Sequence, residues 1–162
     1  MDSDDLERLL IEHTDAWNEH DIDRLMSLFA DDCVFEASGG SEYCGRRFSG
    51  RAQVTSAFAD VLASMPDAHW GDGRHFVIAD EYGVSEWRLT GTLLDGRRVD
   101  VLGCDFITVR DGKVVRKSSF RKQRAPVADS APRGRARSAR DRARPADDRG
   151  GFSWRWRGRR CR

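Results

Sequence analysis

The hydrophobic period of the sequence changes once, at Pro66, and this change restricts the folds that the chain can adopt. Before Pro66, apolar residues recur every three or four positions, which is typical of amphipathic helices. After Pro66, apolar and polar residues alternate, as they do in β-strands with one buried face. Helices that come first and strands that follow predict an α+β domain, in which the helices cover one face of a largely antiparallel sheet.

Three helices are predicted before Pro66. The first spans residues 4–20 and carries one apolar stripe, formed by Leu6, Leu9, Leu10, His13 and Trp17. Asp21 is placed to cap a second helix that ends at the Asp31-Asp32 pair, and its apolar residues are Ile22, Leu25, Met26 and Phe29. The third spans residues 51–65, where Pro66 stops it. Two strands are predicted between the second and third helices, one at residues 33–36 and a short one around Tyr43.

Four long strands are predicted after Pro66, at residues 69–79, 84–94, 99–109 and 114–121. The turns between them are short, and two contain Asp-Gly, a strong hairpin signal. The predicted order is therefore ααββαββββ, with three helices packed on a strongly curved, mixed or antiparallel sheet.

The charges divide the chain near residue 123. Residues 1–123 carry 15 Lys or Arg and 23 Asp or Glu, whereas residues 124–162 carry 13 Arg and 4 Asp. The second segment has no helical or strand period and few apolar residues, so burial would not offset its ordering entropy. We therefore expect one folded domain at residues 1–123 and a disordered, Arg-rich tail at residues 124–162.

Three interpretations of this tail are open. Residues 154–160 combine arginines with tryptophan rings, as do proteins that contact single-stranded nucleic acid. Otherwise the tail is a solvated appendage without a role, or a read-through extension of a GC-rich gene, since this Arg-biased chain has only three lysines. We expect no nucleic-acid partner for the folded domain itself.

The sequence also predicts a location. It contains no run of about 18 apolar residues, so no membrane span is expected. Its first residues are acidic, unlike a secretory signal. The four cysteines, Cys33, Cys44, Cys104 and Cys161, show neither a CxxC pair nor zinc-ligand spacing. We expect a cytoplasmic protein without a structural metal or a disulfide framework.

Two segments resemble the nuclear transport factor 2-like superfamily. Residues 17–35, which contain Ala30-Asp31-Asp32, are similar to its amino-terminal part, and residues 96–114 are similar to its last hairpin. The superfamily includes ketosteroid isomerase, limonene epoxide hydrolase and the SnoaL-like polyketide cyclases, and the resemblance covers about residues 4–122. It implies a cone with an apolar internal pocket and a homodimer formed through the sheet. The fold alone does not specify a reaction.

The isomerase relatives imply positions for three catalytic groups. The oxyanion-binding residue of the first helix corresponds to His13. The second oxyanion residue, an acid kept protonated in an apolar cone, corresponds to Asp105. The general base corresponds to Ala37, which cannot act as one, and Glu36 beside it points to the opposite face of a regular strand.

The epoxide hydrolase relatives imply a different set. Their strand pair corresponds to Glu86 and Arg88, with acid and base in swapped order, and their remaining acid corresponds to Ser119. Glu86 and Arg88 share one face of their strand, and Trp87 lies on the other. The pair would either polarise substrate or water in the cavity or form a solvent-facing ion pair.

Physical chemistry leaves two roles open for each central residue. His13 is either a core residue hydrogen-bonded to a neighbour or, with an ordinary pKa of about 6.5, a proton shuttle in the pocket. A buried carboxylate is costly unless it is paired or protonated. Asp105 therefore acts in the pocket or pairs with His13 or Arg88.

Together these observations predict a small-molecule pocket protein. We expect cofactor-free acid/base isomerisation, cyclisation or hydration of an apolar, oxygenated compound of steroid, terpenoid or polyketide type. The predicted catalytic residues are His13, Asp105, Glu86 and Arg88. The predicted substrate contacts are Trp17, Phe35, Phe58, Tyr43, Trp87 and Ser119, and no metal is expected. The alternative is a non-catalytic ligand-binding or dimeric assembly module of the same fold, which the missing base at Ala37 favours.

Overall fold

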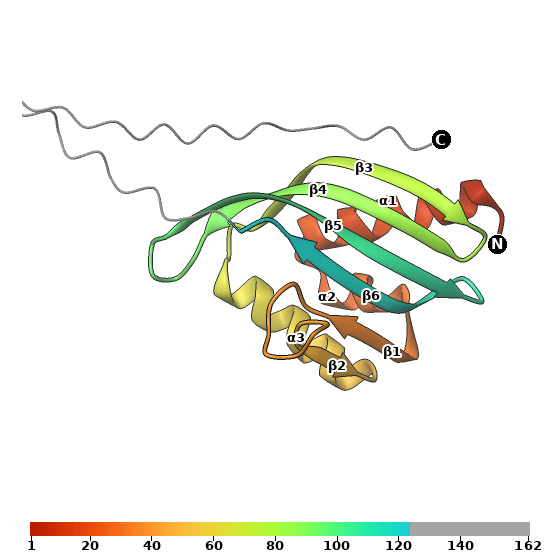
Figure 1. The fold of residues 1–162 in the computed structure, drawn as a ribbon, viewed down its shortest axis with the longest axis horizontal. Coiled ribbons are helices and arrows are strands. Elements are labelled where there is room, and N and C mark those ends of the chain that lie inside the picture. The colour runs from red at the N-terminus through yellow and green to blue at the C-terminus, as the bar shows by residue number, and fades with distance from the viewer. Residues whose placement is uncertain (124–162) are drawn as a thin grey trace, which may run out of the picture. The chain divides into compact units, whose positions relative to one another are not determined.

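A computed structural model describes residues 1–123, and the predicted tail at residues 124–162 lies outside the described residues. The described part has three helices and six strands (Figure 1), in the predicted order ααββαββββ. In chain order they are α1 (Ser3–Asn18), α2 (Ile22–Ser27), β1 (Phe29–Glu36), β2 (Arg47–Ser49), α3 (Arg51–Ser64), β3 (His69–Ala79), β4 (Tyr82–Thr92), β5 (Arg98–Arg110) and β6 (Lys113–Arg121).

Side-chain caps fix the first two helix starts. The carboxylate of Asp2 accepts a hydrogen bond from the backbone N–H of Asp5 at 2.8 Å, and Asp21 accepts one from the N–H of Arg24 at 2.9 Å. Each bond satisfies a backbone donor that has no partner within the first turn. α3 begins after Gly50, whose φ of 83° favours glycine, and ends at Ser64, two residues before Pro66.

The second helix is shorter than its apolar spacing predicts. α2 ends at Ser27, so Phe29 and the Asp31-Asp32 pair belong to β1 instead. The reason is tertiary: Phe29 lies opposite Val114 in a parallel pairing with β6, a partner far away in the sequence. The short second strand is also displaced, because β2 begins at Arg47 and Tyr43 lies in the loop before it.

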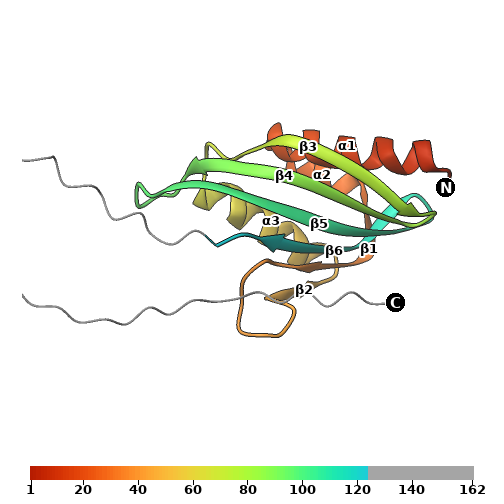
Figure 2. The same ribbon diagram turned by 45° about the horizontal axis from the view of Figure 1, so that its top comes forward.

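The six strands form one mixed sheet in the order β2-β1-β6-β5-β4-β3. β3 to β6 make the predicted antiparallel meander, whereas β1 pairs with β6 in parallel. Figure 2 shows β3 to β6 side by side, with α1 and α3 on one side of them. β6, the last strand within residues 1–123, therefore lies in the middle of the sheet.

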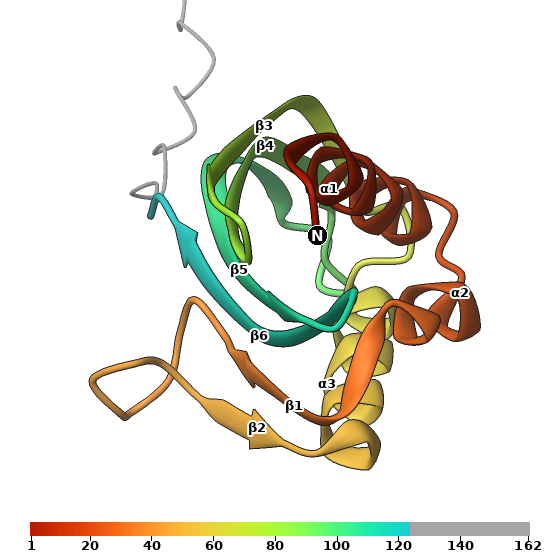
Figure 3. The same cartoon turned by 90° about the vertical axis from the view of Figure 1, so that its right-hand side faces the viewer.

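The sheet curves toward its helices (Figure 3). α1 packs on β3 and β4, α3 packs on β1 and β2, and α2 lies between the two longer helices. The buried core between sheet and helices includes Leu6, Leu10, Leu25, Phe29, Phe58, Ile107, Val109 and Val114. We call the sheet face toward the helices the inner face and the opposite one the outer face. This arrangement is the predicted α+β cone.

Candidate functional site

A row of polar side chains crosses the inner face of the sheet. Cross-strand register places His75 opposite Ser85, Ser85 opposite Asp105 and Asp105 opposite Ser119, on four neighbouring strands. Ser85 and Asp105 are buried. Buried polar groups are costly unless they are paired, so the contacts of this row decide what it can do.

Asp105 is the centre of the row. Its Oδ1 lies 2.6 Å from the Nζ of Lys117 and accepts a hydrogen bond from the hydroxyl of Ser119, also at 2.6 Å. Its Oδ2 accepts a hydrogen bond from the indole N–H of Trp87 at 2.9 Å. The predicted partners His13 and Arg88 do not make these bonds. The carboxylate is therefore fully engaged by groups of β4 and β6.

Lys117 completes this cluster from β6. It is buried, and its Nζ donates a hydrogen bond to the Ser119 hydroxyl at 2.7 Å. The same ammonium lies 5.3 Å from the ring centre of Phe35 and 5.9 Å from that of Trp17, within the range of cation–π attraction. Lys117 is thus a buried amine between a carboxylate, a hydroxyl and two aromatic rings.

Burial and pairing oppose each other in this ion pair. Burial alone would raise the pKa of Asp105, but the Lys117 ammonium and the hydrogen bonds from Lys117 and Ser119 outweigh it and hold that pKa below its usual value. Burial lowers the pKa of Lys117, and the attraction of Asp105 only partly restores it. Asp105 is therefore ionised, not protonated as in the isomerase relatives.

His13 approaches the same region from α1. Its Nε2 accepts a hydrogen bond from the indole N–H of Trp17 at 3.2 Å, so in the neutral ring the hydrogen is on Nδ1. Burial, and then the nearby Lys117 ammonium, lowers the pKa of His13 to about 3. His13 is therefore a neutral imidazole at pH 7. Its Nδ1 is buried and has no hydrogen-bond partner among residues 1–123.

Aromatic side chains surround these polar groups. The ring centres of Trp17 and Phe58 lie 4.8 Å apart, as do those of Trp17 and Trp70, and Phe35 lies 5.0 Å from Phe58. Three of the predicted substrate contacts, Trp17, Phe35 and Phe58, thus meet in one buried cluster. The predicted contacts Trp87 and Ser119 lie beside it, hydrogen-bonded to Asp105.

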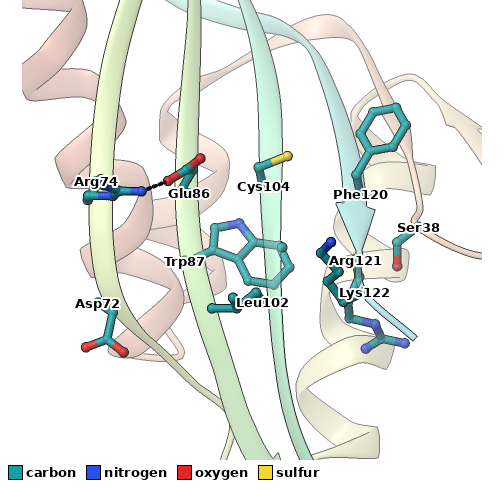
Figure 4. A pocket seen from close by; sticks show the side chains of 11 residues that line it. Ser38, Asp72, Arg74, Glu86, Trp87, Leu102, Cys104, Phe120, Arg121 and Lys122 are labelled. Carbon is teal, nitrogen blue, oxygen red and sulfur yellow. Dashed lines mark hydrogen bonds and ion pairs between the residues drawn. The ribbon is translucent and has the colours of Figure 1, made fainter. Parts of the chain in front are cut away.

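The outer face carries a different row. Arg74, Glu86, Cys104 and Phe120 lie opposite one another on β3 to β6. They line a groove of about 640 Å³ (Figure 4), together with Ser38, Asp72, Leu102, Arg121 and Lys122. Two residues of the inner face, Trp87 and Gly103, also contribute to its lining. A second hollow of about 300 Å³ adjoins it near the β1–β2 loop. Neither His13 nor Asp105 is among the lining residues of these two hollows.

Glu86 and Arg88 both lie on the outer face, which corresponds to the solvent-facing alternative for this pair. Glu86 forms an ion pair with Arg74, and Arg88 forms one with Asp100 at 2.8 Å. Trp87 between them is the residue that points inward, as the alternation of a strand requires. The backbones of Glu86 and Arg88 therefore place these two side chains on the face opposite Asp105.

Tyr43 is also not part of the interior. It lies in the loop between β1 and β2, and its side chain is 97% exposed. The expected second strand around it forms four residues later, at Arg47–Ser49, so the tyrosine has no strand neighbour to hold it inward.

The end of β1 lacks an inward carboxylate. Ala37 stands where the isomerase base is expected, and Glu36 points to the outer face, where its register partners are Arg47 and Ser118. Glu36 is only 1% exposed, and it accepts hydrogen bonds from Arg47 at 2.6 Å and from Arg116. Burial would raise the pKa of Glu36, but these two arginines and Ser118 lower it. Glu36 is therefore a paired anion on the outer face.

Sequence reasoning missed the importance of Lys117. The available signal was parity: Lys117 and Ser119 lie two apart on one strand, so an inward Ser119 implies an inward Lys117. The face on which these two residues lie depends on the register between β5 and β6, which the sequence alone does not give.

Residues 1–123 contain neither a metal-binding cluster nor a membrane-spanning helix. No group of three or more His, Cys, Asp or Glu side chains in this range is arranged to hold a metal ion. No helix within it is long and apolar enough to cross a membrane.

The helices, the curved mixed sheet and the inner polar row define a nuclear transport factor 2-like α+β domain. The sequence matches the model of the SnoaL-like domain over residues 10–117, and the chain belongs to this family. No curated protein matches the chain at a significant level.

Solved structures of this fold are similar to the chain at low sequence identity. A candidate polyketide cyclase from Xanthomonas campestris pv. campestris is 20% identical, with a TM-score of 0.64 over 72% of this chain and 90% of that one. A candidate isomerase from Bacillus subtilis is 19% identical, with a TM-score of 0.62 over 71% and 84%. TerC, co-crystallized with polyporic acid, is 20% identical, with a TM-score of 0.60 over 70% and 88%. These similarities establish the fold.

Proposed function

We propose that the interior of this domain binds a small, apolar, oxygenated molecule and catalyses its isomerisation, cyclisation or hydration by acid/base chemistry without a cofactor. The proposed ligands are steroid-, terpenoid- or polyketide-like compounds. The names of two similar structures, a candidate polyketide cyclase and a candidate isomerase, support this range.

One observation carries the proposal: the buried Nδ1 of His13 has no partner within residues 1–123. A buried donor without a partner costs about 1–3 kcal/mol, so a fold retains one mainly where something else satisfies it. In the neutral ring this atom bears a hydrogen, which suits the carbonyl or hydroxyl oxygen of a ligand. The aromatic cluster of Trp17, Phe35 and Phe58 would cover the apolar part of that ligand.

The charge states of His13 and Asp105 suggest which of them donates a hydrogen bond and which accepts a proton. Neutral His13 would donate its Nδ1–H to a ligand oxygen on which negative charge develops. Asp105, ionised because Lys117 pairs with it, would accept a proton instead of donating a hydrogen bond. In this division the general base is Asp105 of β5, because Ala37 cannot act as one.

The ligand would enter beside the β4–β5 hairpin. Partly buried apolar side chains of α3 and this hairpin pack on the core there: Val61, Leu62, Leu93, Val99 and Val101. The backbone N–H of Leu94 donates to the carbonyl of Ser64 at 3.3 Å, which links the hairpin to the end of α3. Local opening of such a weak link would expose the interior.

The test is a ligand screen read by tryptophan fluorescence and thermal shift, because Trp17 and Trp87 lie in the cluster. A compound that quenches fluorescence and raises the melting temperature should lose at least about tenfold in affinity with His13→Phe, the cost of one good hydrogen bond. His69→Phe, on an exposed position of β3, is the matched control. Equal affinity for both variants would contradict a role for His13.

A second candidate, a homodimeric assembly module, is favoured by the outer face. Four large apolar side chains are exposed there: Phe76 at 41%, Ile78 at 61%, Leu102 at 58% and Phe120 at 57%. Exposed apolar patches of this kind are typical of protein interfaces. A second copy of the chain, facing the groove with its own outer face, would cover them.

Sedimentation equilibrium tests this assembly. Leu102→Glu combined with Phe120→Glu should convert a dimer to a monomer, because four buried charges would face one another across the two-fold axis. Tyr43→Glu, an exposed aromatic outside that row, is the control and should leave the dimer intact. A wild-type chain that remains monomeric at high concentration would exclude the module.

A further inference from the structure

The acid/base roles given to His13 and Asp105 do not use the buried amine of Lys117. We infer that Lys117 forms a covalent imine with an aldehyde or ketone held in the interior, because its Nζ lies between a carboxylate, a hydroxyl and an aromatic wall. The inference rests on the proposed function in that a small molecule must reach the interior. It adds the substrate class, carbonyl compounds, and a covalent step.

The neighbours of Lys117 supply what imine formation needs. An ammonium must first lose a proton, and Oδ1 of Asp105 lies 2.6 Å away to take it. The carbonyl oxygen must then gain protons, and the Ser119 hydroxyl, bonded to both Lys117 and Asp105, can relay them. One carboxylate and one hydroxyl thus serve both directions of proton transfer.

The step balances in atoms, charge and electrons. The lone pair of neutral Nζ attacks the carbonyl carbon, and a C–N bond forms as the carbonyl π pair moves to oxygen. That oxygen takes the proton held by Asp105. The nitrogen then loses its second proton to Asp105, through the Ser119 hydroxyl, and the product is a neutral carbinolamine. Reprotonated through Ser119, the oxygen leaves as water while the nitrogen pair forms the C=N bond. The ammonium and the carbonyl compound have become a protonated imine and one water, with no change in charge.

The surroundings of Lys117 suit both ends of this reaction. The rings of Phe35 and Trp17 face the amine at 5.3 and 5.9 Å, and they would attract the cationic imine as they attract the ammonium. Separately, burial lowers the pKa of Lys117 and so increases the fraction of neutral, nucleophilic amine. Asp105 carries the transferred proton while the nitrogen is neutral, and the protonated imine restores a positive charge beside the carboxylate at the end.

Asp105 does not depend on Lys117 alone. It also accepts hydrogen bonds from Trp87 on Oδ2 and from Ser119 on Oδ1. If Nζ turns toward a ligand carbonyl, these two donors remain in place.

The chain offers an unusually clean experiment, because it contains only three lysines, Lys113, Lys117 and Lys122. The probes are pentane-2,4-dione, which gives a stable coloured enaminone with a reactive amine, and benzaldehyde followed by cyanoborohydride, which fixes an imine as a secondary amine. Intact mass counts the adducts, and peptide mapping locates them. Modification at Lys117 should be at least about tenfold faster than at the other two lysines, as for buried reactive amines.

Two variants separate this inference from a general reactivity of lysines. Lys117→Arg keeps the positive charge but cannot form an imine, and it should abolish the fast adduct. The double variant Lys113→Arg, Lys122→Arg leaves Lys117 as the last lysine, and it should retain the adduct at the wild-type rate. The double variant tests the inference even if Lys117→Arg does not fold.

The outcomes distinguish the imine from the proposed function. Adducts spread evenly over the three lysines, or no adduct at Lys117, would overturn the imine. If tryptophan fluorescence then still reports binding of the same probes, the small-molecule site survives without its covalent step. If neither binding nor an adduct is found, both proposals fail.

Discussion

The two faces of the sheet carry polar residues in very different states. On the inner face, Asp105 and Lys117 are buried, so their ion pair is shielded from water. On the outer face, Arg88 and Asp100 form an ion pair of similar length, 2.8 Å, yet both side chains remain about half exposed. Geometry is similar in the two pairs, whereas solvation is not.

This difference shows that burial, and not the pairing itself, decides how much the loss of one partner of an ion pair costs in stability. Water screens the outer pair and hydrates either partner if the other is lost. The inner pair has no such alternative, so removal of one member leaves a bare charge in a low-dielectric interior. The predictions below test this contrast, beginning with the largest expected effect.

Lys117→Met should be the most damaging substitution. It leaves the Asp105 carboxylate buried without its counter-ion, which costs about 3–5 kcal/mol of unfolding free energy. Urea denaturation followed by circular dichroism measures the loss. The double variant Lys117→Met, Asp105→Leu should recover most of it, because no unpaired charge remains. If the single variant is as stable as wild type, the inner pair does not differ from the outer one.

His13 should make the fold sensitive to acid. In the unfolded chain its imidazole binds a proton below about pH 6.5, whereas the folded pKa is about 3. The unfolded state therefore gains protons first as the pH falls, and stability declines by about 2–3 kcal/mol between pH 6.5 and 4.5. His13→Phe should flatten the stability curve over this range, and the exposed His69→Gln should not. Thermal melts at several pH values measure both.

Gly103→Ala should disturb the inner face through packing alone. A β-carbon at this position would lie 2.2 Å from the Trp87 ring and 2.5 Å from the carbonyl oxygen of Phe120. Moving Trp87 aside weakens its bond to Asp105 and costs about 1–3 kcal/mol. Gly39→Ala, where nothing lies within 4 Å of the added carbon, is the control. Unchanged stability and tryptophan emission in Gly103→Ala would show that the ring is free to move.

Arg88→Met should have the smallest effect. Asp100 is about half exposed and stays solvated when Arg88 is removed, so the melting temperature should change by no more than about 2 °C. Ligand affinity should not change, since Arg88 lies on the face opposite Asp105. A large loss of affinity in this variant would mean that the outer face, and not the inner one, is the binding site.

The fold was predictable because its signals are local. Periodicity, the capping Asp21 and the Asp-Gly turns each act over a few residues, and together they gave the element order correctly. The end of α2 was not predictable in this way. Phe29 continues the helical spacing of Ile22 and Leu25, but its pairing with Val114 of β6 takes it into β1.

The candidate site was predictable in part. The positions of His13 and Asp105 followed from the resemblance, yet the face of each strand is a matter of register. On β4 the apolar Trp87 and Leu89 mark the inner face and would have placed Glu86 and Arg88 outside, but the resemblance assigned this pair to the cavity. On β6 no such contrast exists, because Lys117 and Ser119 face inward among buried residues while Phe120 faces out.

The central position of β6 also has a consequence for how the protein is made. On the ribosome, β1 and the β3–β5 meander emerge before β6, the strand that lies between them. Until β6 is made, each of these two parts of the sheet has an unpaired edge. Lys117 arrives with that final strand and neutralises a carboxylate translated twelve residues earlier. Closure of the sheet and charge compensation are therefore one event.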